Sequence, residues 1–284
     1  MDAQAKDITA TGAVVGRTST WLVGLLFLAI FAPVLADLAA RWWDDSNYSH
    51  GFLVPLIAAY FLWHKRAELA VLPARPSRLG LAILSVGMAL FVFGNAGVEY
   101  FLIAVSMVMA LFGLALYLLG AEFIRRTWFA FFILLFMIPI PGVIYYSLTF
   151  PMQLLASKVS VELMQGLGMS VLRQGNIILL PDRPLEVAEA CSGMRSLISL
   201  MAMGAIFGYM SQPKFWGKMA IFLLAIPVAV IGNVVRVFLT AMIAYVGQLD
   251  PTTEPYHTLL GLSVFVVAFV LLSILALGMR RLSR

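Results

Sequence analysis

Charged side chains are scarce in this sequence, since only 12% of its 284 residues are Asp, Glu, Lys or Arg. Soluble domains carry about a quarter of such residues, so the composition excludes an ordinary soluble globular protein. Hydrophobic residues make up 62% of the chain, and long apolar stretches recur from Trp21 to Met279. Stretches of about 18 residues or more can cross a bilayer core of about 30 Å as helices. The sequence therefore predicts an integral membrane protein.

Other features that the sequence lacks narrow the kind of membrane protein further. The alternation typical of a transmembrane β-barrel is missing, which leaves helices to satisfy the backbone in lipid. Residues 1–20 are polar and show no small-residue cleavage site after a short apolar core, so we do not expect a cleaved signal peptide. We find no internal repeat, no low-complexity segment and no soluble second domain. The net charge of +5 does not argue for nucleic-acid binding, because the position of charges matters more in a membrane protein.

Length and hydropathy predict an all-α polytopic membrane protein with about eight transmembrane helices, in one integral-membrane domain over residues 1–284. The predicted spans, of which the second and fifth are short, are 20–37, 51–64, 79–95, 99–119, 127–141, 191–210, 216–240 and 258–279. Residues 142–190 form one long connection. In this connection we expect an amphipathic helix and a short hairpin around the turn signal Gln174-Gly175-Asn176.

Lysine and arginine gather in alternate connections, whereas the acidic residues are more frequent in the others. The positive-inside rule then places both terminal tails, residues 1–19 and 280–284, in the cytoplasm. The 142–190 connection and the short acidic connections are expected on the outer side.

The single cysteine, Cys191, cannot form an internal disulfide and lies at the outer end of a predicted span, in the charged sequence EACSGMRSL. A thiol reacts as the thiolate, and a helix N-terminus or a nearby cation lowers its pKa below the ordinary value of about 8.5. Cys191 lies at the N-terminus of a predicted helix. The nearby cation could be Arg195, four residues later on the same helical face, or Arg236.

Two further polar groups reach the same depth. An arginine inside a span is costly in lipid and is a functional-site candidate by default. Arg236 lies 17 residues after Met219, or about 26 Å along a helix, with Asn233 on roughly the same face. His257 begins the last predicted span at its outer end. The convergence with Cys191 suggests nucleophilic catalysis, with His257 as the base and an arginine stabilising an oxyanion.

Each of these residues also has a structural interpretation. A lone cysteine in a membrane protein is usually an inert small hydrophobe. Arg195 would pair with Glu189 or Glu186 at the interface, and Arg236 would bind lipid phosphate or extend outwards. His257 would be a solvated loop residue. The joint placement at one depth is what favours catalysis over these separate interpretations.

Three short motifs resemble the signature motifs of the exosortases, membrane cysteine transpeptidases of Gram-negative bacteria with archaeal relatives called archaeosortases. The motifs are AEACSGMR (188–195), GNVVRV (232–237) and HTLLG (257–261), and NYSHGFLVPLIAAYFLW (47–63) is similar to the N-terminal signature of that family. Their order and spacing match the family from residue 47 to residue 261.

The resemblance implies a bacterial inner-membrane enzyme with its active site at the periplasmic face, and it implies neither a cofactor nor a metal. Carried over by motif, Cys191 is the nucleophile, Arg236 stabilises the transition state and His257 is the acid or base. Archaeal relatives have arginine at the histidine position, so whether His257 is a base or orients other groups stays open. Arg195 and Asn233 lie in the same motifs as supporting residues, as does Glu189.

The implied substrates are exported proteins whose C-terminal tail has a Pro-Glu-Pro motif, a transmembrane helix and a basic end. The enzyme would cut near the motif and pass the new carboxyl end to an unidentified acceptor nucleophile. Membrane lipids are the other expected partner. His50 would support the site at the substrate entrance, or would cap and pack a helix together with Ser49 and Gly51, which is the interpretation we favour.

Other functions stay open at this point. A transporter or exopolysaccharide-export component would use Arg236 and Asn233 as a polar path. A plain intramembrane protease would hydrolyse the thioester instead of transferring it. A metal site would take Cys191 and His257 as two ligands, but the sequence offers no clear set of four. A structural helix bundle is the general alternative.

Overall fold

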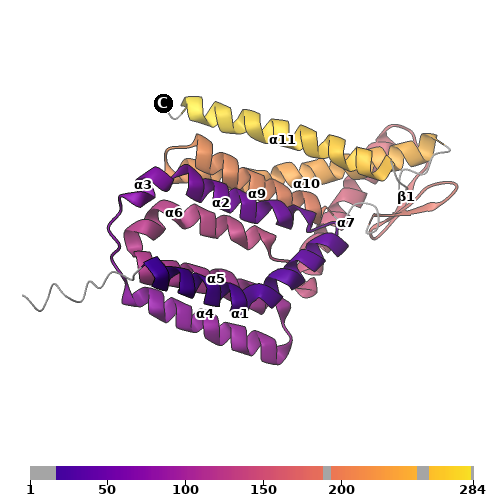
Figure 1. The fold of residues 1–284 in the computed structure, drawn as a ribbon. Coiled ribbons are helices and arrows are strands. Elements are labelled where there is room, and N and C mark those ends of the chain that lie inside the picture. Colours follow the sequence, from indigo (N-terminus) through magenta and orange to yellow (C-terminus); the bar gives the residue numbers. More distant parts are fainter. Residues whose placement is uncertain (1–16, 188–192, 248–255, 283–284) are drawn as a thin grey trace, which may run out of the picture. The chain divides into compact units, whose positions relative to one another are not determined.

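The structure is a computed structural model that describes residues 17–187, 193–247 and 256–282 (Figure 1), with only the backbone described at 17–20, 257 and 282. The chain divides into two compact units, one of residues 1–45 and 51–139 and the other of residues 46–50 and 140–284. Within the described ranges, six helices are long and apolar enough to cross a membrane, or seven if one bent pair counts as a span. The predicted all-helical membrane fold is confirmed.

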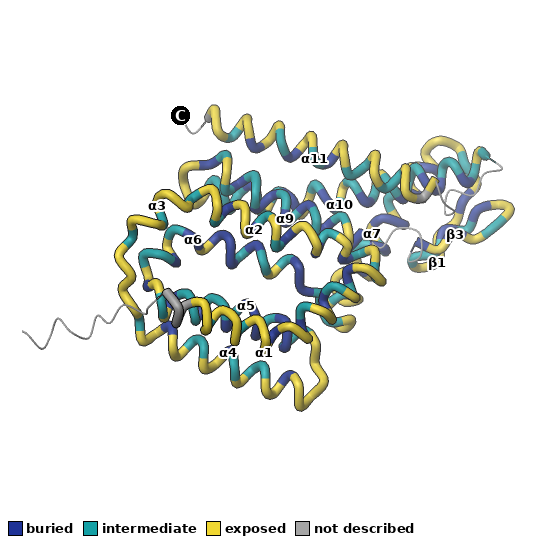
Figure 2. The backbone as a smooth tube through the Cα atoms, viewed as in Figure 1, coloured by how far each residue is buried: buried dark blue, intermediate teal, exposed yellow. Residues whose placement is uncertain are grey.

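The first unit is built around one central helix. Its elements are α1 (Arg17–Asp44), α2 (Leu53–His64), α3 (Arg66–Ala70), α4 (Arg78–Gly97), α5 (Tyr100–Leu119), α6 (Ala121–Leu134) and the 3₁₀ turn η2 (Leu135–Met137). The turn η1 (Ser49–Phe52) precedes α2, and its first two residues belong to the second unit. Helix α5 packs against α1, α4 and α6, while α2 packs on α6. In the most apolar stretch of α5, 44% of the residues are buried, whereas 17% are buried in the corresponding stretches of α1 and α4 (Figure 2). The outer faces of α1 and α4 are therefore available to lipid.

Small residues allow α4 and α5 to approach closely. A Cβ atom added at Gly87 would lie 3.0 Å from the backbone N of Ala110, and one at Gly113 would lie 2.5 Å from the backbone N of Leu84. Hydrophobic burial does not drive helix association in lipid, so close backbone packing at small residues is the usual means of joining transmembrane helices.

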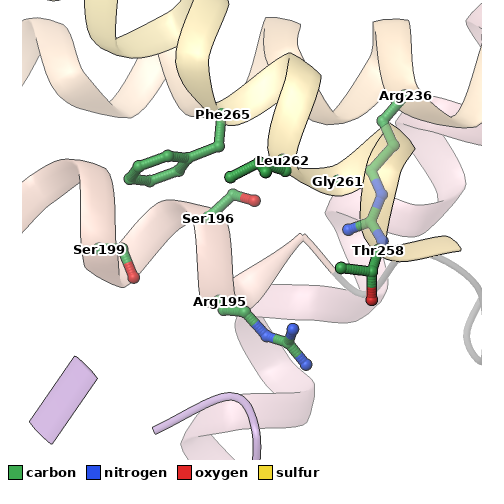
Figure 3. A pocket seen from close by; sticks show the side chains of 8 residues that line it. All are labelled: Arg195, Ser196, Ser199, Arg236, Thr258, Gly261, Leu262 and Phe265. Carbon is green, nitrogen blue, oxygen red and sulfur yellow. The ribbon is translucent and has the colours of Figure 1, made fainter. Parts of the chain in front are cut away.

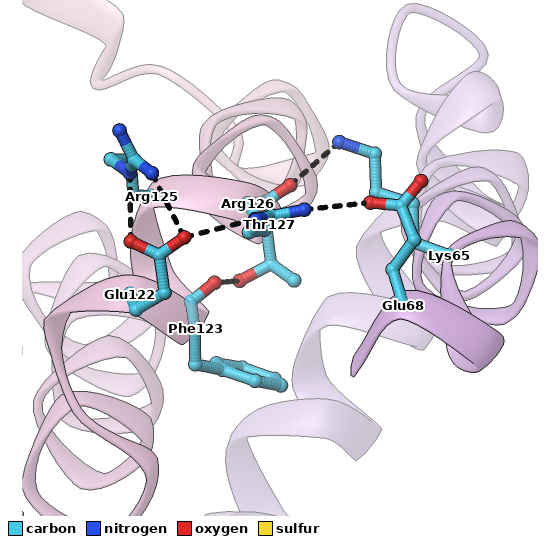
Figure 4. Close-up of polar contacts among 7 residues, drawn as sticks. All are labelled: Lys65, Glu68, Glu122, Phe123, Arg125, Arg126 and Thr127. Carbon is cyan, nitrogen blue, oxygen red and sulfur yellow. Dashed lines mark hydrogen bonds and ion pairs between the residues drawn. The ribbon is translucent and has the colours of Figure 1, made fainter. Parts of the chain in front are cut away.

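A polar network joins the ends of α2, α3 and α6 in this unit (Figure 4). Lys65 donates from Nζ to the Arg126 carbonyl at 2.8 Å, and Arg126 pairs with Glu68 at 3.2 Å and with Glu122 at 3.0 Å. Arg125 also pairs with Glu122, at 2.9 Å. These side chains are largely exposed, and such pairs contribute little to stability. Their number at one end of three helices marks that end as a polar surface.

The second unit is built around α10. Its elements are α7 (Gly142–Gly166), β1 (Leu172–Gln174), β2 (Ile177–Leu179), β3 (Pro184–Glu186), α9 (Met194–Ser211), α10 (Phe215–Val246) and α11 (Tyr256–Leu282). Helix α10 packs against α7, α9 and α11. Glycines again allow close approach, since a Cβ atom at Gly204 of α9 would lie 2.8 Å from the Cβ of Ala225 in α10.

The three strands form a small antiparallel sheet in the order β1-β2-β3. Ile178, Leu185 and Val187 on one face of the sheet join a buried cluster that includes Val237 and Ala241 of α10. The sheet is thus fixed to the turn of α10 that follows Arg236. The predicted hairpin is confirmed at β1 and β2, whereas β3 was not expected.

The long connection also contains the expected helix, α7, and the distribution of its residues is informative. The residues that α7 buries include four polar ones, Thr149, Gln153, Ser157 and Ser160, whereas large apolar side chains such as Leu148 and Phe150 are exposed. A helix that hides its polar face inside the protein and presents apolar residues outwards suits a lipid environment.

Two of the eight predicted spans differ from the structure. Helix α2 has 12 residues and so extends about 18 Å, which is short of a bilayer core of about 30 Å. The predicted span 127–141 is divided, because α6 and η2 are followed by α7 at an angle of 84°. Pro139 and Pro141 lie at this break. Proline lacks the backbone N–H that a continuing helix needs, which explains why the helix ends there.

Candidate functional site

The start of α9 lies against the side chain of Asn233. Gly193, the N-cap of α9, has φ of +74° and follows Cys191 by two residues in the sequence. A Cβ atom at Gly193 would lie 2.8 Å from the amide carbon and nitrogen of Asn233. The residue must therefore be glycine both for its backbone conformation and for the space that Asn233 occupies. This contact joins the cysteine motif to the GNVVRV motif.

Asn233 itself is unusual because only 3% of it is exposed. Neither its amide nitrogen nor its amide oxygen has a hydrogen-bond partner among the described residues. An unsatisfied buried amide costs about 1–3 kcal/mol, and most buried polar groups in proteins are hydrogen-bonded. Each exception needs an explanation, and a role for Asn233 in the site is one that can be tested.

Arg236 lies about one turn after Asn233 on α10 and contacts α11. A Cβ atom at Gly261 of α11 would lie 3.2 Å from the guanidinium carbon of Arg236. The glycine thus leaves room for the guanidinium group to lie over the backbone of α11. This second contact joins the GNVVRV motif to the HTLLG motif, so α10 holds all three motifs in one unit.

The contact between Arg236 and Gly261 borders a pocket of about 260 Å³ (Figure 3). The residues that line it are Arg195, Ser196 and Ser199 of α9, Arg236 of α10, and Thr258, Gly261, Leu262 and Phe265 of α11. Figure 3 shows Arg236 extending from α10 past Gly261 towards Thr258, while Ser196 faces Leu262 and Phe265. The pocket therefore combines two guanidinium groups and three hydroxyl groups with an apolar wall, a lining that can stabilise negative charge.

Arg195 connects the pocket with a segment that comes before α2. Its Nη2 donates a hydrogen bond to the hydroxyl oxygen of Ser46. Two residues later, the hydroxyl oxygen of Tyr48 accepts the backbone N–H of Ile140 at 3.2 Å. Residues 46–50 are thus anchored to the unit that carries the pocket, although they are distant from it in sequence.

The structure describes the side chains of only some of the predicted site residues. Arg195 and Arg236 line one pocket, and Asn233 lies against Gly193. Cys191 and Glu189 lie outside the described residues, and His257 is in the first turn of α11 with its side chain outside them. The roles of all the predicted site residues stay predictions.

His50 lies in η1, with its ring 6.4 Å from the Tyr48 ring, and it is not among the residues that line the pocket. The favoured interpretation of a helix cap is only partly met. The N-cap of α2 is Phe52 and has no side-chain hydrogen bond, whereas the indole ring of Trp42 fills the space beside Gly51.

Sequence reasoning missed Ser46, Ser196, Ser199, Thr258 and Gly261. Thr258 and Gly261 belong to the HTLLG motif, so the motif was the signal that could have identified them. Ser196 is the residue after Arg195, and Ser199 follows Arg195 by four residues, at helical spacing. Ser46 gave no such signal, because only the tertiary fold brings it to α9.

Residues 42–274 match the model of the transmembrane exosortases. The chain belongs to the transmembrane exosortase family. The match includes Ser46 and every residue that lines the pocket. Exosortases are generally cysteine transpeptidases, and membership implies a role in sorting proteins with PEP-CTERM tails. No curated protein and no solved structure matches this exosortase.

Proposed function

We propose that this exosortase cleaves the PEP-CTERM-type tail of exported proteins through a thioacyl intermediate on Cys191 and transfers the new C-terminus to an acceptor. The observation that carries the proposal is the pocket in which α9, α10 and α11 bring Arg195, Arg236 and Thr258 together. Each of these residues comes from a different signature motif.

The proposed chemistry proceeds in two steps. The thiolate of Cys191 attacks the scissile carbonyl carbon, and the oxyanion that forms is stabilised by the guanidinium group of Arg236. The C–N bond then breaks, the leaving amine takes a proton from His257, and a thioester remains on Cys191. In the second step the acceptor nucleophile gives a proton to His257, attacks the thioester and releases the thiolate.

We place the pocket at the periplasmic face, with both termini in the cytoplasm. The distribution of lysine and arginine supports this orientation. So does the polar network of Figure 4, since it joins the C-terminal end of α2 to the N-terminal end of α6, two ends that the sequence assigns to the cytoplasmic side. In this orientation the tail helix of the substrate would reach the pocket laterally through the bilayer.

A trapping experiment in membranes tests the proposal. The exosortase is co-expressed with an exported protein that carries a Pro-Glu-Pro tail, and wild type is compared with Cys191→Ala and Cys191→Ser. We expect loss of the tail only with wild type, together with an enzyme–substrate adduct that hydroxylamine cleaves. Mass spectrometry of the product then separates transfer from hydrolysis, because a free carboxylate indicates attack by water. Normal processing by Cys191→Ala would contradict the proposal and favour a transport path at Arg236 and Asn233.

A further inference from the structure

The outer edge of β3 presents backbone groups that the sheet does not use. The Val187 N–H donates to the Asn176 carbonyl at 3.1 Å, and the Leu180 N–H donates to the Arg183 carbonyl at 3.1 Å. Hydrogen bonding alternates along an antiparallel strand. Arg183, Leu185 and Val187 therefore direct their backbone groups towards β2, and the two residues between them direct theirs to the opposite side.

The two outward-directed residues are Pro184 and Glu186. Both are exposed, whereas Leu185 between them is buried. No hydrogen bond joins either of them to another residue that the structure describes. An exposed edge of this kind is a template for an added strand. Because proline has no N–H, this edge offers two carbonyl acceptors and a single donor, the N–H of Glu186.

The position of β3 along the chain selects it over β1, the other edge of the sheet. Glu186 lies five residues before Cys191, so the chain can separate them by no more than roughly 18 Å. The β1 edge lies two strands further away, about 10 Å across the sheet. Of the two edges, that of β3 is therefore the one that chain length alone keeps within this distance of the proposed nucleophile.

We propose that the outer edge of β3 binds the Pro-Glu-Pro segment of the substrate as an added parallel strand. The proposal rests on the proposed function. Under that function the substrate chain runs from its exported part towards a tail helix in the bilayer. The chain of the enzyme continues from β3 to Cys191, which the proposed function places at the membrane edge. The two strands therefore run in the same direction. Edge-strand addition is a common mode of peptide recognition, in which main-chain hydrogen bonds supply affinity.

The motif matches this edge in its backbone chemistry. In a parallel pair, a substrate residue opposite Leu185 donates its N–H to the Pro184 carbonyl and accepts the N–H of Glu186. The residues on either side of it direct nothing towards the edge, so they can be prolines without loss of a hydrogen bond. A Pro-Glu-Pro segment has its only N–H at the middle residue, which is the one that this edge requires.

The side chains also suit this register. The glutamate of the motif would lie on the same face of the sheet as Leu185, which packs in one cluster with Val237 of α10. That helix carries Arg236, the residue next to Val237. The two prolines would lie on the face of Pro184 and Glu186, so the carboxylate of the motif avoids the carboxylate of Glu186.

The first test changes the edge of the enzyme. Full-length exosortase in lipid nanodiscs is given a synthetic peptide with the motif and the tail helix, and kcat/KM for cleavage is measured. Glu186→Pro removes the outward N–H and leaves the pairing with β2 intact, whereas Glu186→Ala removes only the carboxylate. We expect kcat/KM of Glu186→Pro to be about tenfold below that of Glu186→Ala, as the loss of one hydrogen bond requires. Equal values for the two variants would overturn the proposal.

The second test changes the substrate and uses wild-type enzyme, so it decides the matter even where Glu186→Pro fails to fold. N-methylation of the motif glutamate should lower kcat/KM by about tenfold, whereas N-methylation four residues upstream, beyond β3, should not. Equal cleavage of all peptides would show that the edge does not bind the motif. Cleavage of the unmodified peptide by Cys191→Ala would instead contradict the proposed function.

Discussion

Gly261 offers the sharpest residue-scale prediction, because an added methyl group would lie 3.2 Å from the guanidinium carbon of Arg236. We expect Gly261→Ala to displace Arg236 and to lower tail cleavage by at least tenfold. The helix itself should gain stability, since alanine is favoured over glycine in a helix by about 1 kcal/mol. Gly278→Ala in the same helix is the matched control, as its Cβ atom would meet nothing within 4 Å. Cleavage is measured in membranes. Equal rates for the two variants would show that the space beside Gly261 is not needed for activity.

Asn233 gives a second prediction, in which stability and activity change in opposite directions. Asn233→Leu replaces a buried amide that has no partner among the described residues by an apolar group of similar shape. Such replacements are neutral or stabilising, so we expect the Tm in detergent to stay equal or rise while cleavage is lost. Ser160→Ala is the control, since Ser160 is another buried residue without a partner for its hydroxyl group. It should keep full activity. A large drop in Tm for Asn233→Leu would show that the amide is structural.

At the scale of elements, the start of α9 depends on two separate demands on Gly193. Its φ of +74° disfavours other residues, and its Cβ position is taken by Asn233. Gly168 has a similar φ of +82° but open space around it, so Gly168→Ala measures the backbone cost alone, expected at about 1–2 kcal/mol. We expect Gly193→Ala to cost more in the free energy of unfolding and to abolish cleavage. Equal costs for the two variants would mean that Asn233 moves aside freely.

Some of the helices and strands could be predicted from the sequence, and others could not. Long apolar runs and the turn at Gly175 were sufficient for α5, α10 and the first hairpin, because burial in lipid and local turn chemistry decide those elements. The strand β3 was missed because Pro184-Leu185-Glu186 has little strand propensity and pairs only through its neighbours. The bend before α7 was missed because hydropathy alone does not register the prolines at 139 and 141.

For the candidate site, the motifs indicate which residues are candidates, but they could not predict how these residues meet. Arg236 was identified from its cost in a span, yet its contact with Gly261 depends on how α10 packs against α11. The bond between Arg195 and Ser46 likewise joins residues that are 149 positions apart. Contacts of this kind are set by tertiary packing and have no local periodicity that a single sequence would reveal.

At the scale of the whole molecule, the proposed orientation makes the prediction with the widest consequences. The chain has a single cysteine, so Cys191→Ala provides a background without thiols. Into it we would introduce Asp182→Cys at the tip between β2 and β3, Arg125→Cys in the polar network, or Arg281→Cys near the end of α11. These three positions are exposed, so a membrane-impermeant maleimide can reach each of them from its own side.

In spheroplasts we expect labelling at position 182 alone, and after permeabilisation labelling at all three positions. The physical reason is that the positive-inside rule assigns the basic ends of α6 and α11 to the cytoplasm, while the proposed function requires the sheet to face the exported substrate. Labelling at positions 125 and 281 but not at position 182 in intact spheroplasts would show that the protein has the opposite orientation in the membrane. The pocket and the β3 edge would then face the cytoplasm, where a substrate that has already been exported could not reach them.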